Sequence, residues 1–230
     1  MTGKLIVIDG TDGTGKETQA NLLVKRLKRN GFVVELIDFP QYGKKSAGLV
    51  EEYLNGRYGS AQEVGAYRAS IFYAGDRFDG SFFIRKWLQQ GEIVVSNRYV
   101  AANMGHQGGK IANDQERARY YEWLYHLEYE IFQIPKPDLN IILHLDAAIA
   151  QKLVDKKSAR KYIAGKKRDI HEDDLGHLRQ AEKAYLQIAQ QFEDFILIEC
   201  GRNNKIMPRQ VINDLIWNEV SKLLKIENRG

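Results

Sequence analysis

The sequence predicts an α/β fold in which a five-stranded parallel sheet is flanked by helices on both faces. Two observations predict it: strand-length apolar runs alternate with helix-length amphipathic segments, and the apolar runs are nearly continuous. Alternation of this kind is typical of parallel sheets, and continuous apolar strands suit a sheet that is covered on both faces. The expected strands span residues 4–9, 32–38, 92–96, 139–145 and 195–199.

The expected helices carry apolar residues three or four positions apart, a spacing that places them on one helix face. Between the first two strands, Ala20, Leu23 and Leu27 follow this spacing, and Asn30-Gly31 ends the segment. A strand, a helix and a strand therefore open the chain. Further helices are expected from three apolar sets: Tyr120, Leu124, Leu127 and Ile131; Leu178, Ala181, Tyr185, Ile188 and Phe192; and Ile212, Leu215, Ile216 and Val220.

Composition limits the class of protein. The chain has 230 residues, of which 43% are hydrophobic and 28% charged, so it can bury a core and is expected to form one domain, residues 1–230. Its apolar runs are far shorter than the ~18 residues that cross a membrane, and the first run ends at Asp9, too soon for a signal peptide. The single cysteine, Cys200, forms no intrachain disulfide, so the reducing cytoplasm is the expected compartment.

Positive charge is concentrated in one segment. Seven basic residues and no acidic residue lie between positions 156 and 168, and this local charge exceeds the net charge of +4 of the whole chain. Such a segment suits an anionic partner. Tyr162 is its only aromatic residue and four acidic residues follow it, which favours a small phosphate ligand over nucleic acid; a solvated loop is the alternative.

A glycine-rich loop lies between the first strand and the first helix, the context of a phosphate-binding loop. Glycines let the backbone wrap so that N–H groups point inward, the helix N-terminus adds positive potential, and the final lysine reaches the outer phosphates of a nucleotide. The loop therefore predicts nucleotide binding. Its residues are Gly10, Thr11, Asp12, Gly13, Thr14, Gly15 and Lys16.

The residue after the lysine departs from the usual loop. Most such loops place a Ser or Thr there as a magnesium ligand, whereas this chain has Glu17 followed by Thr18. Either metal coordination moves to other residues, or the protein binds nucleotide without turning it over. Binding and catalysis are therefore separate questions.

Four further motifs follow in order: Phe39-Pro40-Gln41-Tyr42-Gly43, Tyr73-Ala74-Gly75-Asp76-Arg77, Asn97-Arg98-Tyr99 with Asn103, and Pro135-Lys136-Pro137-Asp138-Leu139. With these motifs and Asp12 inside the loop, the chain resembles the thymidylate kinase family almost from end to end. Members transfer the γ-phosphate of ATP to dTMP. The resemblance implies a P-loop kinase fold with a mobile basic lid at about residues 155–174, ATP and Mg²⁺ as cofactors, and a homodimer packed through helices. Residues 120–123 are candidates for that interface if their aromatic rings are not core.

The resemblance also implies roles for single residues. Arg98 is expected to hold the acceptor monophosphate, Asp12 to lie beside it and the metal, and Lys16 to bind the donor phosphates. Doubly wound sheets place ligands at the carboxyl ends of their strands, where a guanidinium such as that of Arg98 can grip phosphate. Asp12 is thus an implied metal ligand, and we expect Glu17 to be a second one; the candidate catalytic residues of the lid are Arg160, Lys161 and Arg168.

For the acceptor base, the resemblance implies an aromatic platform at Tyr73, an arginine at Arg77 and an amide at Asn103. A donor from Arg77 and the donor and acceptor of Asn103 suit the O4 and N3 edge of thymine or uracil. Phe39 and Tyr42 are expected to complete the monophosphate pocket. Cytosine presents the opposite edge, so dTMP is the expected acceptor.

Two places depart from the family pattern. Most members have Asp-Arg where this chain has Asn97-Arg98, so a carboxylate near the metal is missing, and we expect Glu17 to replace it and to share one ion with Asn97. Many members have Ala-Tyr-Gln-Gly where this chain has Gly105-His106-Gln107-Gly108. His106 and Gln107 are expected to line the substrate pocket, and the smaller His106 predicts tolerance of a ribose acceptor.

Other functions compete with that of a kinase. A degenerate, kinase-like module that binds nucleotide without turnover is favoured by Glu17 and Asn97, but not by the intact Lys16 and Arg98. A guanine-specific switch lacks the aspartate expected two positions after Asn204-Lys205. The leading hypothesis is an ATP- and Mg²⁺-dependent kinase of a pyrimidine nucleoside monophosphate, with no membrane or nucleic-acid partner.

Overall fold

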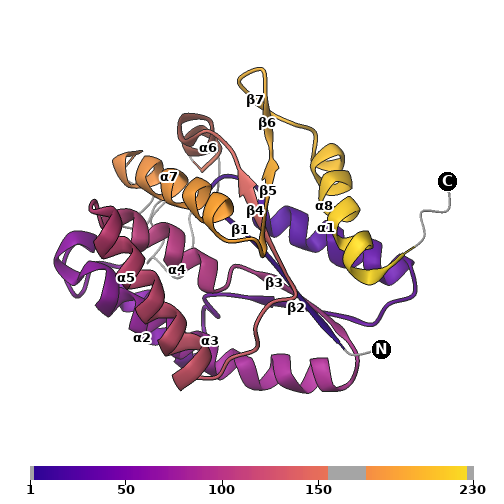
Figure 1. The fold of residues 1–230 in the computed structure, drawn as a ribbon, viewed down its shortest axis with the longest axis horizontal. Coiled ribbons are helices and arrows are strands. Elements are labelled where there is room, and N and C mark those ends of the chain that lie inside the picture. The colour runs from indigo at the N-terminus through magenta and orange to yellow at the C-terminus, as the bar shows by residue number, and fades with distance from the viewer. Residues whose placement is uncertain (1–2, 155–174, 227–230) are drawn as a thin grey trace.

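The computed structural model describes residues 3–154 and 175–226. Within them, five parallel strands form one sheet in the order β2-β3-β1-β4-β5 (Figure 1). The predicted five-stranded parallel sheet is confirmed, although the second strand begins two residues later than expected, because Phe32 and Val33 belong to the preceding connection. The strands of this sheet are β1 Lys4–Gly10, β2 Val34–Asp38, β3 Ile93–Asn97, β4 Leu139–His144 and β5 Phe195–Glu199, and β6 Gly201–Arg202 pairs separately with β7 Lys205–Ile206 in an antiparallel hairpin.

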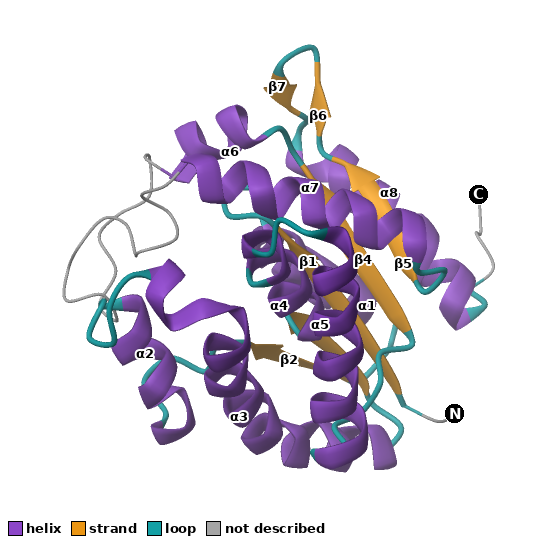
Figure 2. Ribbon diagram, turned by 60° about the vertical axis from the view of Figure 1, so that its left-hand side comes forward, coloured by secondary structure: helices purple, strands orange, loops and turns teal. Residues whose placement is uncertain are grey.

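Helices cover both faces of the sheet (Figure 2). They are α1 Lys16–Arg29, α2 Gly48–Leu54, α3 Ala61–Gln89, α4 Val100–His106, α5 Asp114–Tyr125, α6 Ala147–Val154, α7 Leu175–Gln191 and α8 Arg209–Leu224. Two 3₁₀ helices, η1 Lys45–Ala47 and η2 Gly108–Lys110, and a π-helix, η3 His126–Ile131, complete the set. Helices α1 and α8 pack on one face, whereas α3, α4, α5 and α7 pack on the other.

The side chains of β1 alternate between two apolar layers. Ile6 and Ile8 pack beneath α1 and α8, whereas Leu5 and Val7 pack in the layer of α3, α4, α5 and α7. All four are fully buried, and burial of an aliphatic side chain of this size stabilises a fold by about 1.5–3 kcal/mol. This alternation follows from the twofold period of a strand and explains why the apolar run is continuous.

Helix α3 is long and the sequence pattern did not predict it. It begins with a capping box in which Ser60 accepts from the backbone of Glu63 and the Glu63 side chain returns to the backbone of Ser60. Gly65 then interrupts the helix with a φ of 75°. Large apolar side chains such as Tyr67 and Ile71 are exposed on this helix, which removes the amphipathic contrast that a sequence prediction needs.

The carboxyl ends of β1, β2 and β3 meet at one edge of the sheet. Asn97 is the register partner of Ile8 in β1 and of Asp38 in β2. Strand β3 therefore lies between the two strands that open the chain. The glycine-rich loop leaves β1 at this same edge, as expected for a ligand site in a doubly wound sheet.

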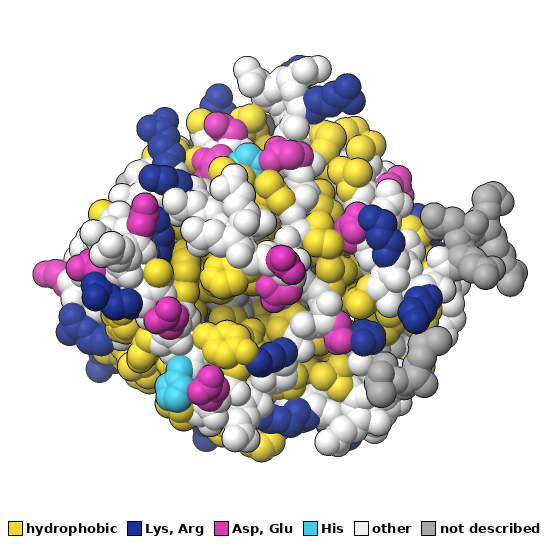
Figure 3. All heavy atoms as spheres, in the orientation of Figure 1, with side chains coloured by type: hydrophobic (Ala, Val, Ile, Leu, Met, Phe, Trp, Pro, Cys, Tyr) yellow, Lys and Arg dark blue, Asp and Glu magenta, His cyan; other side chains and the backbone are white. Residues whose placement is uncertain are grey.

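Charged side chains of both signs are interspersed over the face shown in Figure 3. In residues 3–154 and 175–226, no helix has the length and apolar character needed to cross a membrane. The expected basic lid, about residues 155–174, lies outside the described residues. Cys200 is a buried, free thiol, which agrees with a role in the core.

His144 joins several elements at the end of β4. Its Nδ1 contacts Glu199 in β5, and its Nε2 lies 2.8 Å from a carboxylate oxygen of Glu182 in α7. The other oxygen of Glu182 accepts from the backbone N–H of Ala147, which begins α6. Partial burial alone would lower the pKa of the His144 imidazole, but the hydrogen bonds with Glu182 and Glu199 outweigh burial and raise this pKa.

We predict that His144→Gln lowers the melting temperature more at low pH than at high pH. Because the pKa of His144 is raised in the folded state, the stabilising charge is fully present below the unfolded pKa of about 6.5 and is lost as the pH rises through the folded pKa. We expect the loss at about pH 5.5 to exceed the loss at about pH 8.5 by about 2–4 °C in thermal unfolding. Equal losses at both pH values would contradict this assignment.

Candidate active site

The phosphate loop connects β1 to α1, and its shape requires its glycines. Gly13 and Gly15 adopt positive φ angles of 89° and 88°, which residues with a side chain adopt only at a cost. A Cβ at Gly10 would lie 2.3 Å from the carbonyl oxygen of Leu143, and one at Gly13 would lie 2.2 Å from that of Ala150. The loop therefore rests against the backbone of β4 and α6.

Lys16 lies across this loop. Its Nζ donates to the carbonyl oxygen of Thr11 at 2.8 Å and is 3.7 Å from Oδ1 of Asp12. The hydroxyl of Thr14 donates to the same carbonyl at 2.9 Å. The buried ammonium group is thus held at the mouth of the loop, where the outer phosphates of a nucleotide would lie.

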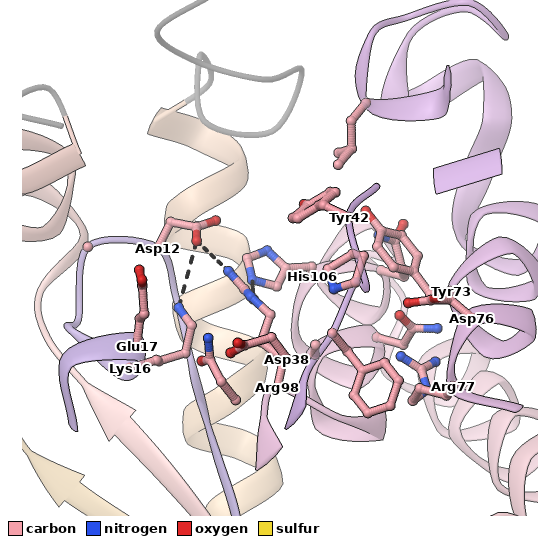
Figure 4. Close-up of a pocket in the computed structure, with 18 of the residues that line it drawn as sticks. Asp12, Lys16, Glu17, Asp38, Tyr42, Tyr73, Asp76, Arg77, Arg98 and His106 are labelled. Atoms are coloured by element: carbon pink, nitrogen blue, oxygen red, sulfur yellow. Dashed lines mark hydrogen bonds and ion pairs between the residues drawn. The ribbon is translucent and has the colours of Figure 1, made fainter. Parts of the chain in front are cut away.

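One cavity of about 510 Å³ opens at this edge of the sheet (Figure 4). It brings together most of the predicted site residues, from the phosphate loop, the segment after β2, α3 and α4. Those that line it are Asp12, Gly13, Gly15, Lys16, Glu17, Thr18, Phe39, Tyr42, Tyr73, Arg77, Arg98, Asn103, His106 and Gln107. Gly10, Thr11 and Thr14 shape the loop from beneath instead.

Arg98 lies between the phosphate loop and His106 (Figure 4). Its Nη2 is paired with Asp12, and its Nη1 is 3.1 Å from Nε2 of His106. Its backbone is left-handed, with a φ of 67°, and its N–H donates to the carbonyl oxygen of Ile8 at 2.9 Å. Burial would lower the pKa of this guanidinium, but the charge of Asp12 more than compensates, so Arg98 stays protonated.

His106 is buried and uncharged. Burial and the positive charge of Arg98 hold the pKa of its imidazole well below the usual value. Because a guanidinium only donates, the neutral ring accepts from Arg98 through Nε2. The ring also stacks on His177, with centroids 5.7 Å apart, and meets Tyr185 edge-on. His106, the last residue of α4, therefore packs against α7 and orients Arg98.

Asn103 has a defined amide orientation. Its Nδ2 donates to the carbonyl oxygen of Ser70 at 3.3 Å, and a carbonyl only accepts, so the amide cannot be flipped. The hydroxyl of Tyr120 donates to the backbone carbonyl of Asn103 at 3.2 Å and lies 2.7 Å from the hydroxyl of Ser70. The hydrogen bond to Ser70 fixes which side of the amide carries the oxygen, and it engages one of the two amino hydrogens of Asn103.

Arg77 lines the same cavity, but most of its guanidinium is engaged. Its Nε donates to Oε1 of Glu128 at 3.0 Å, its Nη2 contacts the same oxygen, and its Nη1 donates to the carbonyl oxygen of Tyr99 at 3.3 Å. The sequence pattern did not single out Glu128, since a carboxylate between Leu127 and Ile131 is typical of an exposed helix face. Ile131 is in fact exposed, contrary to the expected apolar stripe.

Asp76 ties the segment after β2 to α3. This buried carboxylate accepts from the backbone N–H of Gln41 at 2.8 Å and from the hydroxyl of Ser46 at 2.6 Å. A Cβ at Gly80 would lie 2.6 Å from the ring of Phe39. These contacts hold Phe39 against the helix, so the segment keeps its place along the cavity.

A further carboxylate, Asp38, lies near Glu17 and was not singled out from the sequence. The side chain of Asn97, its register partner, lies beside the Asp38 carboxylate and favours its charged form. Burial raises the pKa of Asp38, Asn97 lowers it, and the negative charge of Glu17 raises it further. Oδ1 of Asn97 is buried and has no hydrogen-bond partner in the described part of the chain.

The predicted metal ligands and lid residues have less structural support than the residues that line the pocket. Within the described residues, no three or more His, Cys, Asp or Glu side chains are grouped so as to hold a metal ion. Arg160, Lys161 and Arg168 lie outside the described residues, so their role at a phosphate stays a prediction.

Comparison with known proteins identifies the family. A family model described as thymidylate kinase matches residues 8–210. The thymidylate kinase of Mycobacterium tuberculosis is 27% identical over 188 residues, which cover 81% of this chain and 86% of the relative. A probable thymidylate kinase of Thermococcus onnurineus is 28% identical over 227 residues, 96% of this chain and 98% of the relative.

A solved structure supports the fold. The thymidylate kinase of Candida albicans superposes with a TM-score of 0.71 at 20% identity, covering 97% of this chain and 93% of the other. At 20% identity, the structural similarity shows the fold alone. The family is shown by the family model, which matches most of the sequence. The chain belongs to the thymidylate kinase family of phosphotransferases.

Proposed function

We propose that this protein transfers the γ-phosphate of ATP to a pyrimidine nucleoside monophosphate, with dTMP as the preferred acceptor. The observation that carries the proposal is that one cavity joins the phosphate loop, at Lys16, to the base-binding residues Tyr73 and Asn103, with Arg98 between them. Phosphoryl transfer needs little covalent help from a protein. Most of the rate enhancement comes from holding the two nucleotides in line and from neutralising the charge on the transferred phosphoryl group.

The base end of the cavity suits thymine or uracil. One amino hydrogen of Asn103 is directed to the Ser70 carbonyl, which fixes the orientation of the amide, and its side-chain oxygen is an acceptor that matches the N3 hydrogen of a keto pyrimidine. Arg77 presents donors, which match O4. Cytosine offers an acceptor at N3 and an amino group at C4, so both contacts are reversed.

Arg98 is our candidate for the acceptor phosphate. It is charged, held by Asp12 and His106, and lies between the base residues and the loop. A guanidinium suits two phosphate oxygens at once. Lys16 is our candidate for the donor phosphates. Ribose tolerance through His106 stays a prediction.

We propose Glu17 and Asp12 as magnesium ligands. Both line the cavity, and carboxylate oxygens suit Mg²⁺, which usually binds one or two carboxylates together with substrate phosphates and water. The Oδ1 of Asn97, which has no hydrogen-bond partner among the described residues, leaves one further hard oxygen at this edge of the sheet. When bound, the ion neutralises charge on the donor phosphates. Among the described residues, no structural feature favours the alternative of a module that binds nucleotide without turnover. We assign the reaction to the cytoplasm, consistent with the free thiol of Cys200.

We propose a homodimer that packs through α3. Tyr67, Ile71, Phe78 and Phe82 recur at spacings of four and seven along this helix, and all four are exposed. Their rings and branched side chains form one apolar stripe, and such stripes mark interfaces. The stretch 120–123 is less suited, because Tyr120 and Tyr121 are buried core residues.

We predict that dTMP and dUMP are phosphorylated with a kcat/KM at least about 100-fold above that of dCMP, because dCMP reverses both base contacts. Asn103→Ala should reduce this ratio by about tenfold and leave the KM for ATP unchanged. Steady-state kinetics with the three monophosphates measure it. A dTMP/dCMP ratio that survives the substitution would remove Asn103 from base recognition, and the absence of turnover with every monophosphate would refute the kinase.

We predict that Glu17→Ser lowers Mg²⁺-dependent turnover by about tenfold or more, as loss of a metal-supporting carboxylate does. Adding Asn97→Asp should restore part of the rate, because the new carboxylate lies on the neighbouring strand end beside Asp38. Rates measured against Mg²⁺ concentration give the apparent metal affinity of each variant. Losses that simply add in the double variant would show that the two positions act independently.

We predict that the wild-type chain sediments as a dimer and that Phe82→Glu sediments as a monomer, because the charge would be buried in the interface. Val33→Glu is the matched control, since Val33 is equally exposed but lies before β2, away from the stripe. Analytical ultracentrifugation measures the mass. A Phe82→Glu chain that remains dimeric would place the interface elsewhere.

A further inference from the structure

Glu128 is a buried carboxylate that the phosphoryl-transfer chemistry does not use. It lies in the π-helix η3, 51 positions along the chain from Arg77, and it is 0% exposed. One of its oxygens, Oε1, receives both Nε and Nη2 of Arg77. The other, Oε2, is buried with no hydrogen-bond partner among the described residues.

The contribution of this buried ion pair to the stability of the fold does not explain its presence. A buried ion pair rarely stabilises a fold more than well-packed apolar side chains of similar size, and a carboxylate oxygen without a donor adds a further cost. Its neighbours include the buried Tyr99 and the partly buried Tyr129, whose pKa values are raised, by burial first and also by the charge of Glu128. The presence of Glu128 is better explained by its effect on Arg77.

Glu128 fixes the direction of the Arg77 guanidinium. Arg77 has five N–H groups. The one on Nε and one of the two on Nη2 contact Glu128, and one of the two on Nη1 donates to the carbonyl oxygen of Tyr99. Contacts on two sides define the plane of the group. One hydrogen on each terminal nitrogen is left within the described residues, and Arg77 lines the cavity.

The π-helix explains how a carboxylate comes to lie there. A π-turn inserts one extra residue and shifts the side chains that follow it, and such turns are frequent at functional sites. Two exposed members of η3, His126 and Glu130, pair with each other at the surface, whereas Glu128 faces inward. The turn therefore separates a solvent-facing pair from the one carboxylate that reaches Arg77.

We propose that Glu128 is a positioning residue for base recognition: it orients Arg77 so that its free hydrogens meet the O4 of the acceptor pyrimidine. The proposal rests on the proposed function, since it assumes a nucleoside monophosphate in this cavity. Glu128 itself does not touch the substrate. Burial would lower the pKa of the Arg77 guanidinium, but the charge and hydrogen bond of Glu128 raise it, which keeps Arg77 a donor.

The test compares Glu128→Gln with a matched control, Glu130→Gln, which removes an exposed carboxylate from the same turn. Two acceptors are used, dTMP and 4-thio-dTMP, which differ only in the atom that Arg77 would contact; sulfur is the weaker acceptor. For the wild type we expect kcat/KM to favour dTMP by about tenfold, the worth of one charge-assisted hydrogen bond. Glu130→Gln should behave as the wild type does.

For Glu128→Gln we expect the KM for dTMP to rise about tenfold, the KM for ATP to stay unchanged, and the preference for dTMP over 4-thio-dTMP to fall below about twofold. Equal losses for both acceptors, with the preference intact, would show a merely structural clamp between α3 and η3 and would overturn the proposal. A wild type that phosphorylates neither acceptor would refute the proposed function instead.

If Glu128→Gln does not fold, Glu128→Asp decides the question. The shorter side chain keeps the charge but cannot reach Arg77 in the same geometry. We expect it to fold, as judged by circular dichroism and melting temperature, and to lose part of the preference for dTMP over 4-thio-dTMP. A preference equal to that of the wild type would overturn the proposal.

Discussion

Asp9 is the residue on which the geometry of the site depends. This carboxylate is 1% exposed at the end of β1, and it accepts from the backbone N–H groups of Gly10 and Tyr99 and from the hydroxyl of Tyr185. The first donor opens the phosphate loop, the second follows Arg98, and the third belongs to α7. A buried carboxylate with three donors is well satisfied, so one side chain fixes three elements in place.

The backbone of Arg98 follows from this arrangement. The N–H of Tyr99 turns toward Asp9, while the N–H of Arg98 donates to the carbonyl oxygen of Ile8. The chain satisfies both only by turning sharply, which puts Arg98 at a φ of 67°. A residue with a side chain in this region costs about 1–3 kcal/mol. The surrounding hydrogen bonds offset that cost. The left-handed backbone directs the guanidinium of Arg98 into the cavity before any ligand binds.

Local sequence patterns were enough to predict the sheet and the phosphate loop, because apolar strand segments and the glycine spacing of the loop each depend on consecutive residues. Pocket residues such as Arg98 and Asn103 were expected from the family resemblance, and the cavity contains them. The partners of Arg77 and of the Asn103 amide could not be predicted. Glu128 looks like a solvent-facing residue of an amphipathic pattern, and only the packing of η3 against α3 brings it to Arg77. The orientation of the Asn103 amide likewise depends on a carbonyl of α3.

The strand order has a consequence for how the chain acquires its site. The opening unit, residues 4–38, contains the whole phosphate loop, yet β1 and β2 are not neighbours, and β3 separates them. Parallel strands pair only across long connections, whose closure costs entropy and slows folding. During synthesis β1 therefore has no paired strand until the chain extends through β3 to Asn97, and the phosphate loop has no backbone to rest against until the chain reaches Leu143 and Ala150.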